Sequence, residues 1–276
     1  MKLTKGHYLY FGLLSVIALG LLAIFMPTAI LQSPLTTPTE YLSTMPYTHL
    51  FGTDIIIITP TSTFLIYFLG IQTVILGYTF LKNKQYSTHF WWGIAMVFWG
   101  IGALLAGTSY QGLGYELKCV GNDYCIHTSW FELAYYYFTA LSMSALGFAI
   151  AKTILPLDKQ RFLILYSKIA IVVYTFLLVL GSVIQNRFLI SYELFTLFFM
   201  PLYIIFFIYS VQLYKKNHDQ LNKTLIYTWL LFLIVNASYY VYYFLGIGES
   251  LYRNTSIWFS ANDVLHVTLI LWMVYI

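Results

Sequence analysis

The sequence predicts an all-α polytopic membrane protein, with eight transmembrane helices in a single domain over residues 1–276. Composition is the first reason: of the 276 residues, 60% are hydrophobic and only 9% are charged, whereas a soluble domain has roughly 25% charged residues. The second is that the apolar residues form eight stretches, each near the ~20 residues that cross a bilayer. The third is a bias of lysine and arginine toward alternate loops. That bias explains the net charge of +4, and nothing indicates a nucleic-acid partner.

The eight stretches are separated by short, more polar loops. They lie at residues 8–31, 54–81, 90–113, 130–152, 162–184, 192–213, 224–246 and 257–276. The first follows Lys2 and Lys5 as a signal peptide would, but its apolar run of about 25 residues is longer than the ~7–15 of a signal-peptide core. We therefore predict that residues 1–32 form an uncleaved extra helix ahead of a seven-helix bundle over residues 54–276.

The basic residues give the bundle an orientation. An even number of spans places both termini on the same side of the membrane. The N-terminus and the loops on its side hold ten basic residues: Lys2, Lys5, Lys82, Lys84, Lys152, Lys159, Arg161, Lys215, Lys216 and Lys223. The opposite loops hold three: Lys118, Arg187 and Arg253. Cytoplasmic loops of membrane proteins are enriched in lysine and arginine, so we expect both termini in the cytoplasm and the protein in the cell inner membrane.

The two cysteines, Cys119 and Cys125, are the only ones in the chain and lie in the segment KCVGNDYC. The charge bias places this loop outside, where an oxidising compartment permits a disulfide. Two unrelated thiols are the alternative. A zinc site is disfavoured because no second CxxC or HxxxH pair accompanies them. We predict a disulfide between Cys119 and Cys125.

Polar residues inside the predicted spans gather in the outer half of the membrane. They are Asp54, Ser109, Gln111, Glu132, Glu193, Asn236, Asn262, Asp263 and His266. Ionisable groups within a membrane are costly, face the bundle interior and mark functional sites. The pattern therefore predicts a polar pocket that opens to the outer leaflet. A buried polar hub that only holds helices together is the alternative for these residues.

The segment SANDVLHVTLI contributes most of this polarity. His266 lies roughly ten residues into the last span, Asn262 precedes it by four positions and Asp263 by three, so all three share one broad stripe of a helix. We select His266, Asp263, Ser109 and Glu132 as candidate catalytic residues. An imidazole oriented by a carboxylate can act as a general base, with Ser109 as nucleophile or hydrogen-bond donor.

Four further residues are candidates for ligand binding: Gln111, Asn262, Asn236 and Tyr240. Tyr240 belongs to the run YYVYYF, which can equally serve packing and the interfacial aromatic belt. His266 is also the candidate metal ligand if a metal is present. Asparagine is a poor zinc ligand, so a zinc site would need further ligands, drawn from Asp263, Glu132, His127 and His49. The cofactor is therefore left open.

The order of these motifs resembles a known superfamily. The segment GTSYQG at Gly107–Gly112, an acidic residue in an outer position and NDVLH in the last span follow one another along seven helices. This layout is similar to the alkaline ceramidases and the progestin and adipoQ receptors, which are seven-helix membrane hydrolases. Their three zinc histidines activate water against a lipid amide.

The resemblance assigns a place to each motif residue. Ser109 stands at the family's serine, Gln111 at its first histidine, and Asn262 and His266 at its HxxxH stripe. Glu132 or Asp54 stands at its aspartate. Only one of the three zinc histidines is therefore present.

Two functions follow from this comparison. The first is a hydrolase of a lipid amide or another amphiphile. The alternative is a non-catalytic binder or sensor of a lipid-like ligand that has lost the metal site. A transporter is disfavoured because the polar residues stop at one leaflet. Membrane lipids are the expected partners in either case.

Overall fold

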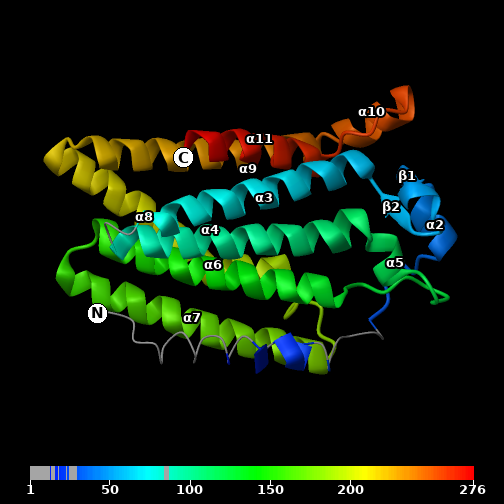
Figure 1. Ribbon diagram of the computed structural model, residues 1–276, viewed down its shortest axis with the longest axis horizontal. Helices are drawn as coiled ribbons and strands as arrows, with labels where there is room; N and C mark the ends of the chain where they lie inside the picture. The colour runs from blue at the N-terminus through cyan, green and yellow to red at the C-terminus, as the bar shows by residue number, and fades with distance from the viewer. Residues whose placement is uncertain (1–12, 14–15, 18, 23, 25–29, 84–86) are drawn as a thin grey trace.

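The computed structural model describes residues 13, 16–17, 19–22, 24, 30–83 and 87–276. Most of the predicted first span at 8–31, and with it the extra helix over 1–32, lies outside the described residues. The long helices run side by side along one direction, and a small cap of short elements covers one end of the bundle (Figure 1).

Over residues 30–83 and 87–276, seven longer helices build the bundle. They are α3 (Pro60–Lys82), α4 (Ser87–Ala106), α6 (Trp130–Ile154), α7 (Leu157–Val183), α8 (Tyr192–Asn217), α9 (Gln220–Phe244) and α11 (Ala261–Tyr275). A π-helix, η2 (Gly107–Gly112), continues α4 directly. Further short elements are α2 (Pro38–Ser43), β1 (Tyr47–His49), η1 (Leu50–Gly52), β2 (Ile56–Ile58), α5 (Gly114–Lys118) and α10 (Ile247–Thr255).

Within the described residues, six helices are long and apolar enough to cross a membrane: α3, α4 with η2, α6, α7, α8 and α9. The protein is therefore an integral multi-pass membrane protein, as predicted. The last predicted span, 257–276, is a shorter apolar helix of 15 residues. It begins only at Ala261 because Ser260 caps it. Its length of about 22 Å, at 1.5 Å per residue, is less than the ~30 Å of a bilayer core.

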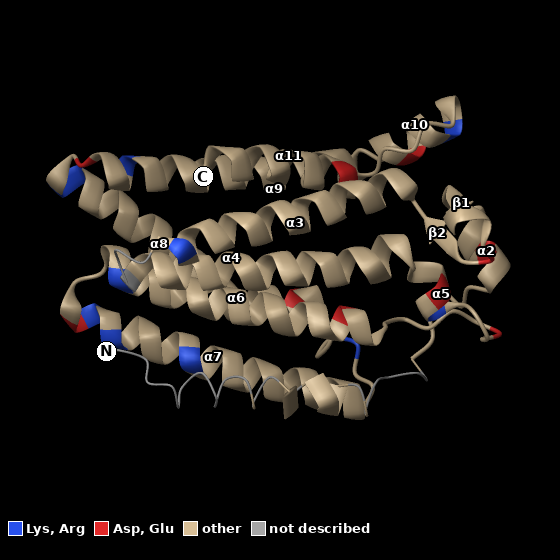
Figure 2. Ribbon diagram, in the orientation of Figure 1, with Lys and Arg blue, Asp and Glu red and all other residues tan. Residues whose placement is uncertain are grey.

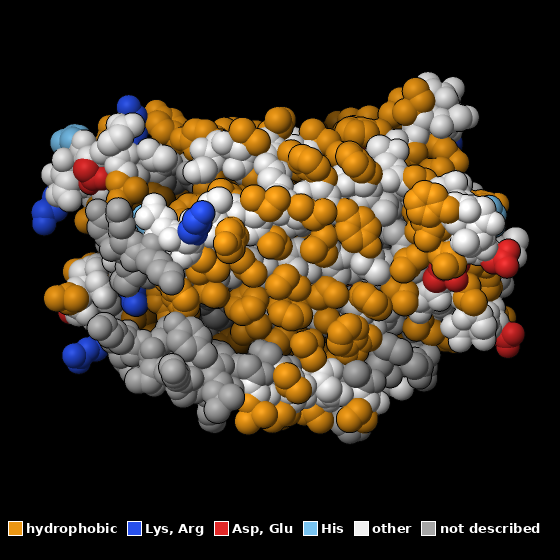
Figure 3. Space-filling view, viewed as in Figure 1, with side chains coloured by type: hydrophobic (Ala, Val, Ile, Leu, Met, Phe, Trp, Pro, Cys, Tyr) orange, Lys and Arg blue, Asp and Glu red, His pale blue; other side chains and the backbone are white. Residues whose placement is uncertain are grey.

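Charged residues separate toward the two ends of the bundle. Most Lys and Arg lie at the end where α8 meets α9, and several Asp and Glu lie at the opposite end, where the cap is (Figure 2). Between these ends the visible face consists mainly of hydrophobic side chains (Figure 3). An apolar belt between two polar ends is the surface that a bilayer requires.

Helix α6 is the central element of the bundle. It packs against α4, α7 and α8, and most of its residues are buried. Its Tyr137 is fully buried, as are Tyr174 of α7 and Phe199 of α8. Phe195 and Phe199 surround the Tyr174 ring at centroid distances of 5.9 and 5.7 Å. Aromatic residues therefore form the core between α6, α7 and α8.

Two pairs of glycines join α3 to α4. A Cβ atom on Gly100 would lie 2.6 Å from the carbonyl oxygen of Gly70, and one on Gly77 would lie 2.8 Å from that of Gly93. The two backbones are thus in direct contact at two levels. Small residues permit this close approach in membranes, where packing replaces the hydrophobic effect between helices. This seam was not predicted from the sequence.

The cap contains the β1–β2 hairpin and the disulfide. Strands β1 and β2 are antiparallel, with His49 opposite Ile56. The predicted second span was therefore wrong at its start: residues 56–58 form a strand, since β-branched isoleucines favour one, and α3 begins at Pro60. Asp54 consequently lies exposed in the hairpin loop rather than inside a helix. Cys119 and Cys125 form the predicted disulfide, with Cα atoms 4.2 Å apart.

Candidate functional site

The π-helix η2 places Ser109 in the interior. Its wider turn is closed by the Leu113 amide, which donates to the Thr108 carbonyl at 2.7 Å. Gly107 permits the approach of α3, because a Cβ atom there would lie 2.5 Å from Ile66. Ser109 itself is fully buried. Short π-helical segments within α-helices occur often at functional sites, which makes Ser109 a candidate for function.

Ser109 belongs to a hydrogen-bonded group that we call the Glu132 cluster: Ser109, Lys118, Ser129 and Glu132. The Ser109 hydroxyl donates to Glu132 Oε1 at 2.8 Å. Its oxygen lies 2.6 Å from Ser129 Oγ, which therefore donates to it, because a hydroxyl has one hydrogen. Lys118 forms an ion pair with the same carboxylate. The cluster is a buried charge pair with added hydrogen bonds, the form in which such a pair is tolerated.

Lys118 is the member that sequence reasoning missed. It was counted only as a loop charge, yet it is almost completely buried. Its ammonium also lies 4.9 Å from the centre of the Tyr110 ring, and Tyr110 shares a hydrogen bond of 3.2 Å with Tyr136. The sequence signal that could have indicated its burial is its position next to Cys119, because a disulfide fixes the residues beside it in the fold. The Glu132 cluster thereby connects η2, α5 and α6.

A second polar group lies on α11 and consists of Asp263 and His266, which we call the polar pair. Ser260 and Asp263 form a capping box at the start of the helix: Asp263 Oδ2 accepts from the Ser260 amide at 2.6 Å and from its hydroxyl at 2.8 Å. The exposed fraction is 0% for Asp263 and 7% for His266. Residues three positions apart lie on the same side of a helix, so the carboxylate and the imidazole face the interior together.

Each member of the polar pair has a buried atom without a hydrogen-bond partner in the described part of the chain. These atoms are Asp263 Oδ1 and His266 Nδ1. A buried polar atom that makes no hydrogen bond costs stability, and native structures contain few of them. In the Glu132 cluster, by contrast, no buried side-chain atom lacks a partner in this way. The polar pair therefore has the unused binding capacity that a functional site needs.

An apolar core lies beside the polar pair, further from the cap. It comprises Ile66, Leu69, Met96, Ala103, Val235, Leu269 and Met273. Leu269 follows His266 by three positions, so the imidazole lies one turn closer to the cap than this core. At the cap end, the buried Ser62 of α3 accepts a hydrogen bond of 3.3 Å from the Trp258 ring, and Tyr242 of α9 donates to the Phe259 carbonyl at 2.8 Å. Residues of α3, α9 and α11 thus surround the cap end of this core.

The remaining candidates occupy other places. Asn262 is exposed, although it shares the helix with His266. Asn236 is half-buried and donates to the Phe232 carbonyl of its own helix at 2.8 Å. Tyr240 is exposed and stacks on Phe244 at 5.9 Å. Gln111 is buried, and its Oε1 has no partner among the described residues.

The structure does not join the two groups into one hydrogen-bonded site. Among the described residues, no hydrogen bond or ion pair links Ser109 or Glu132 to Asp263 or His266. Over the same residues, no group of three His, Cys, Asp or Glu side chains could hold a metal ion. His49 is exposed on β1 and His127 is half-buried in the loop before α6. The donor set around His266 therefore does not fit a zinc site of the ceramidase type.

No protein-family model matches the chain, and no curated protein or solved structure is significantly similar to it. The resemblance to the ceramidase superfamily stays a prediction.

Proposed function

We propose that the protein binds a lipid-like molecule in the outer half of its bundle and that Asp263 and His266 hold the polar head of this ligand. One observation carries the proposal: two adjacent turns of α11 bury a carboxylate oxygen and an imidazole nitrogen that have no partner among the described residues. A carboxylate oxygen accepts hydrogen bonds, and an imidazole nitrogen donates or accepts according to its tautomer. Together they can bind a head group that offers hydroxyl, amide or ammonium hydrogens.

The Glu132 cluster has a supporting role in this proposal. Ser109 gives its hydrogen to a carboxylate that is already paired with Lys118, so both groups are engaged within the protein. We therefore assign Ser109 and Glu132 to the scaffold that joins the cap to the bundle. Asp263 and His266 are the residues that contact the ligand.

The binding test compares lipids that remain with the purified protein. Wild type, Asp263→Asn and His266→Gln are reconstituted in phosphatidylcholine nanodiscs, and bound lipids are identified by native mass spectrometry. Asparagine keeps the capping oxygen of residue 263 while it removes the charge, so the helix start is preserved. We expect both variants to lose a lipid that wild type retains. Asp158→Asn, at an exposed position of α7, is the matched control, and equal lipid content in all four proteins would reject the proposal.

Hydrolysis is the second candidate. It is favoured by the spacing of Asp263 and His266, which are buried three positions apart on α11, because a carboxylate near an imidazole is the usual arrangement of a general base. The test is release of fatty acid from a fluorescent ceramide in vesicles, together with metal analysis of the purified protein. Activity and stoichiometric zinc that are both lost in His266→Ala would establish the ceramidase-type enzyme. If the protein is metal-free and inactive but retains lipid, the hydrolase is rejected and the lipid-binding function remains.

The orientation is part of the proposal. We infer that the cap lies outside and that both termini are cytoplasmic. The supporting observation is that Lys82, Lys152, Lys215 and Lys216 lie in the last turns of α3, α6 and α8, which end on the same side of the bundle. Cysteines introduced at Ser250 and Asn217 test this with a membrane-impermeant thiol reagent. In intact cells, only the cysteine at position 250 should react.

A further inference from the structure

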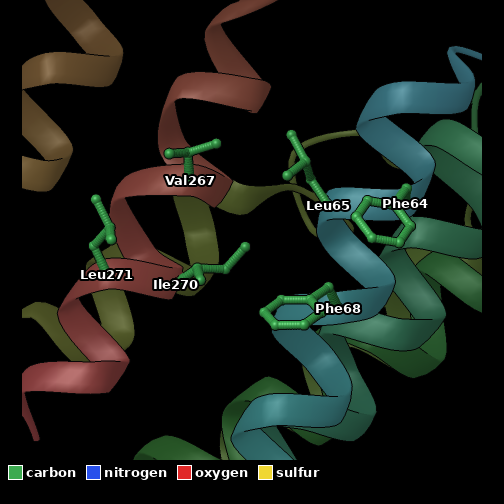
Figure 4. Close-up of a pocket in the computed structure, with 6 residues that line it drawn as sticks. All are labelled: Phe64, Leu65, Phe68, Val267, Ile270 and Leu271. Carbon is green, nitrogen blue, oxygen red and sulfur yellow. The ribbon is translucent and has the colours of Figure 1, made fainter.

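An apolar groove lies between α3 and α11. Its lining residues are Phe64, Leu65, Phe68, Val267, Ile270 and Leu271, and its volume is about 250 Å³. The side chains of Ile270 and Phe68 point toward one another across it (Figure 4). Phe64 and Leu271 are largely exposed, so the groove opens on the lipid-facing surface of the bundle.

The groove and the polar pair are consecutive along α11. Ile270 follows His266 by four residues and Asp263 by seven, and these spacings place all three on one side of a helix. The rise from His266 to Ile270 is about 6 Å at 1.5 Å per residue. On α3, Ser62 precedes Leu65 by three residues and is therefore also one turn further out. About one turn of α11 therefore separates the apolar groove from the polar layer that contains Asp263 and His266.

The inner end of the groove is closed by a contact between the two helices. Gln72 of α3 lies one turn inward of Phe68, and its amide donates to the Ile270 carbonyl at 3.3 Å. This hydrogen bond ties α3 to α11 below the groove. The accessible directions are therefore sideways into the bilayer and outward toward the polar pair.

We propose that this groove holds the hydrocarbon chain of the ligand whose head the polar pair binds. The inference rests on the proposed function and extends it by naming the ligand class: a membrane amphiphile with one chain in the groove and a head group that donates hydrogen bonds. Hydrocarbon is the occupant because the lining is entirely apolar and continuous with the lipid-facing surface. A donor head is required because no lysine or arginine in the described chain forms an ion pair with Asp263.

The test uses a photoactivatable lipid. A long-chain N-acylethanolamine with a diazirine in its chain and an alkyne tag supplies both amide and hydroxyl donors. It is added to phosphatidylcholine nanodiscs that contain the protein, and labelled peptides are mapped by mass spectrometry. In wild type, labelling should concentrate on the groove residues of α3 and α11. Labelling spread evenly over exposed residues of α7, such as Val172 and Phe176, would overturn the proposal.

Matched variants test the groove directly. Val267→Phe fills the groove with a larger side chain, so labelling should fall about ten-fold, which corresponds to about 1.4 kcal/mol of binding free energy. Val274→Phe makes the same change one heptad away, at a position that is 74% exposed, and should leave labelling unchanged. Leu271→Phe is the second groove variant. Its side chain is 64% exposed to lipid, so it tests the groove without a risk to folding, and its labelling should also fall.

The variants of the polar pair separate the two proposals. If Asp263→Asn and His266→Gln reduce labelling while Val267→Phe and Leu271→Phe do not, the chain lies elsewhere and the proposed function stands. If the groove variants reduce labelling and the polar-pair variants do not, the groove binds hydrocarbon without the head-group site, and the proposed function fails. If none of the four reduces it, both proposals are rejected.

Discussion

Lys118 of α5 and Glu132 of α6 form a buried ion pair, with side chains that are 7% and 3% exposed. The pair joins the cap to the central helix of the bundle. Ser109 adds a hydrogen bond to the same carboxylate oxygen. The cap is therefore fixed to the bundle by charge as well as by the polypeptide chain.

Removal of one partner of this pair should destabilise the protein strongly. Lys118→Met leaves the Glu132 carboxylate buried without its cation, which costs about 3–5 kcal/mol in comparable cases. Thermal unfolding in detergent should show a large decrease in Tm. The double variant Lys118→Met/Glu132→Gln should recover much of the loss because no buried charge remains. The control is Arg253→Ala, which breaks the exposed pair with Glu249 and should cost no more than about 1 kcal/mol. Equal effects of the two single variants would contradict the burial argument.

The glycine seam between α3 and α4 should tolerate no side chain. Gly100→Ala and Gly77→Ala each place a Cβ atom against a backbone carbonyl, at 2.6 and 2.8 Å, and backbone cannot move aside as a side chain can. We expect a loss of about 1–3 kcal/mol for each, the usual cost of overpacking, measured as a decrease in Tm. Gly20→Ala is the control, since a Cβ atom there would have no neighbour within 4 Å. A decrease in Tm for Gly20→Ala alone would count against the seam.

Reduction of the disulfide should loosen the cap. The bond between Cys119 and Cys125 closes a loop with a sequence separation of 6, for which chain entropy predicts a contribution of about 2–3 kcal/mol. Cys119→Ser/Cys125→Ser should unfold at a lower temperature than wild type and should no longer respond to dithiothreitol. The mobility of wild type on a non-reducing gel should change on reduction. If dithiothreitol left the Tm of wild type unchanged, the disulfide would have no part in stability.

Acid should destabilise the cap through His127. Partial burial, with the nearby charges of Arg187 and Lys118, lowers the pKa of His127 below its usual 6.5, although Glu132 opposes the shift. The unfolded chain then binds a proton more readily than the folded one, so stability decreases as the pH falls below 6.5 toward the lower folded value. His127→Asn removes this titrating group and, with it, its contribution to the pH dependence of stability. The Tm of this variant should depend less on pH between about 7.5 and 5.5 than that of wild type, and parallel Tm curves for the two proteins would exclude the effect.

The sequence predicted the spans better than their contacts. Apolar length identifies a membrane helix whichever way it faces, so α6, α8 and α9 were found within a few residues of their ends. The interior of a membrane protein is about as apolar as its lipid-facing surface, and the pattern therefore does not reveal which side of a helix is buried. The contact of Gly70 with Gly100 and the burial of Lys118 depend on that missing information.

The candidate site, too, could be predicted only where its geometry is local to one helix. Spacing correctly placed Asp263 beside His266, because both lie on one helix and the geometry is local. It also placed Asn262 on their stripe, whereas Asn262 is exposed. Whether Ser109 or Glu132 reaches the polar pair depends on the packing of η2 and α6 against other helices, and a single sequence does not contain that information.

The glycine seam and two hydrogen bonds hold both walls of the groove in place. Helix α3 is held to α4 by backbone contact at two levels, so this wall is stationary. Helix α11 is tied to α3 at the inner end of the groove through Gln72, and toward its outer end it carries the polar pair with its unused hydrogen-bonding atoms. Just ahead of α11, the Trp258 ring also donates to Ser62 of α3, so the two helices are fastened on both sides of the groove. The groove is then a slot of fixed length, which opens only along its exposed side.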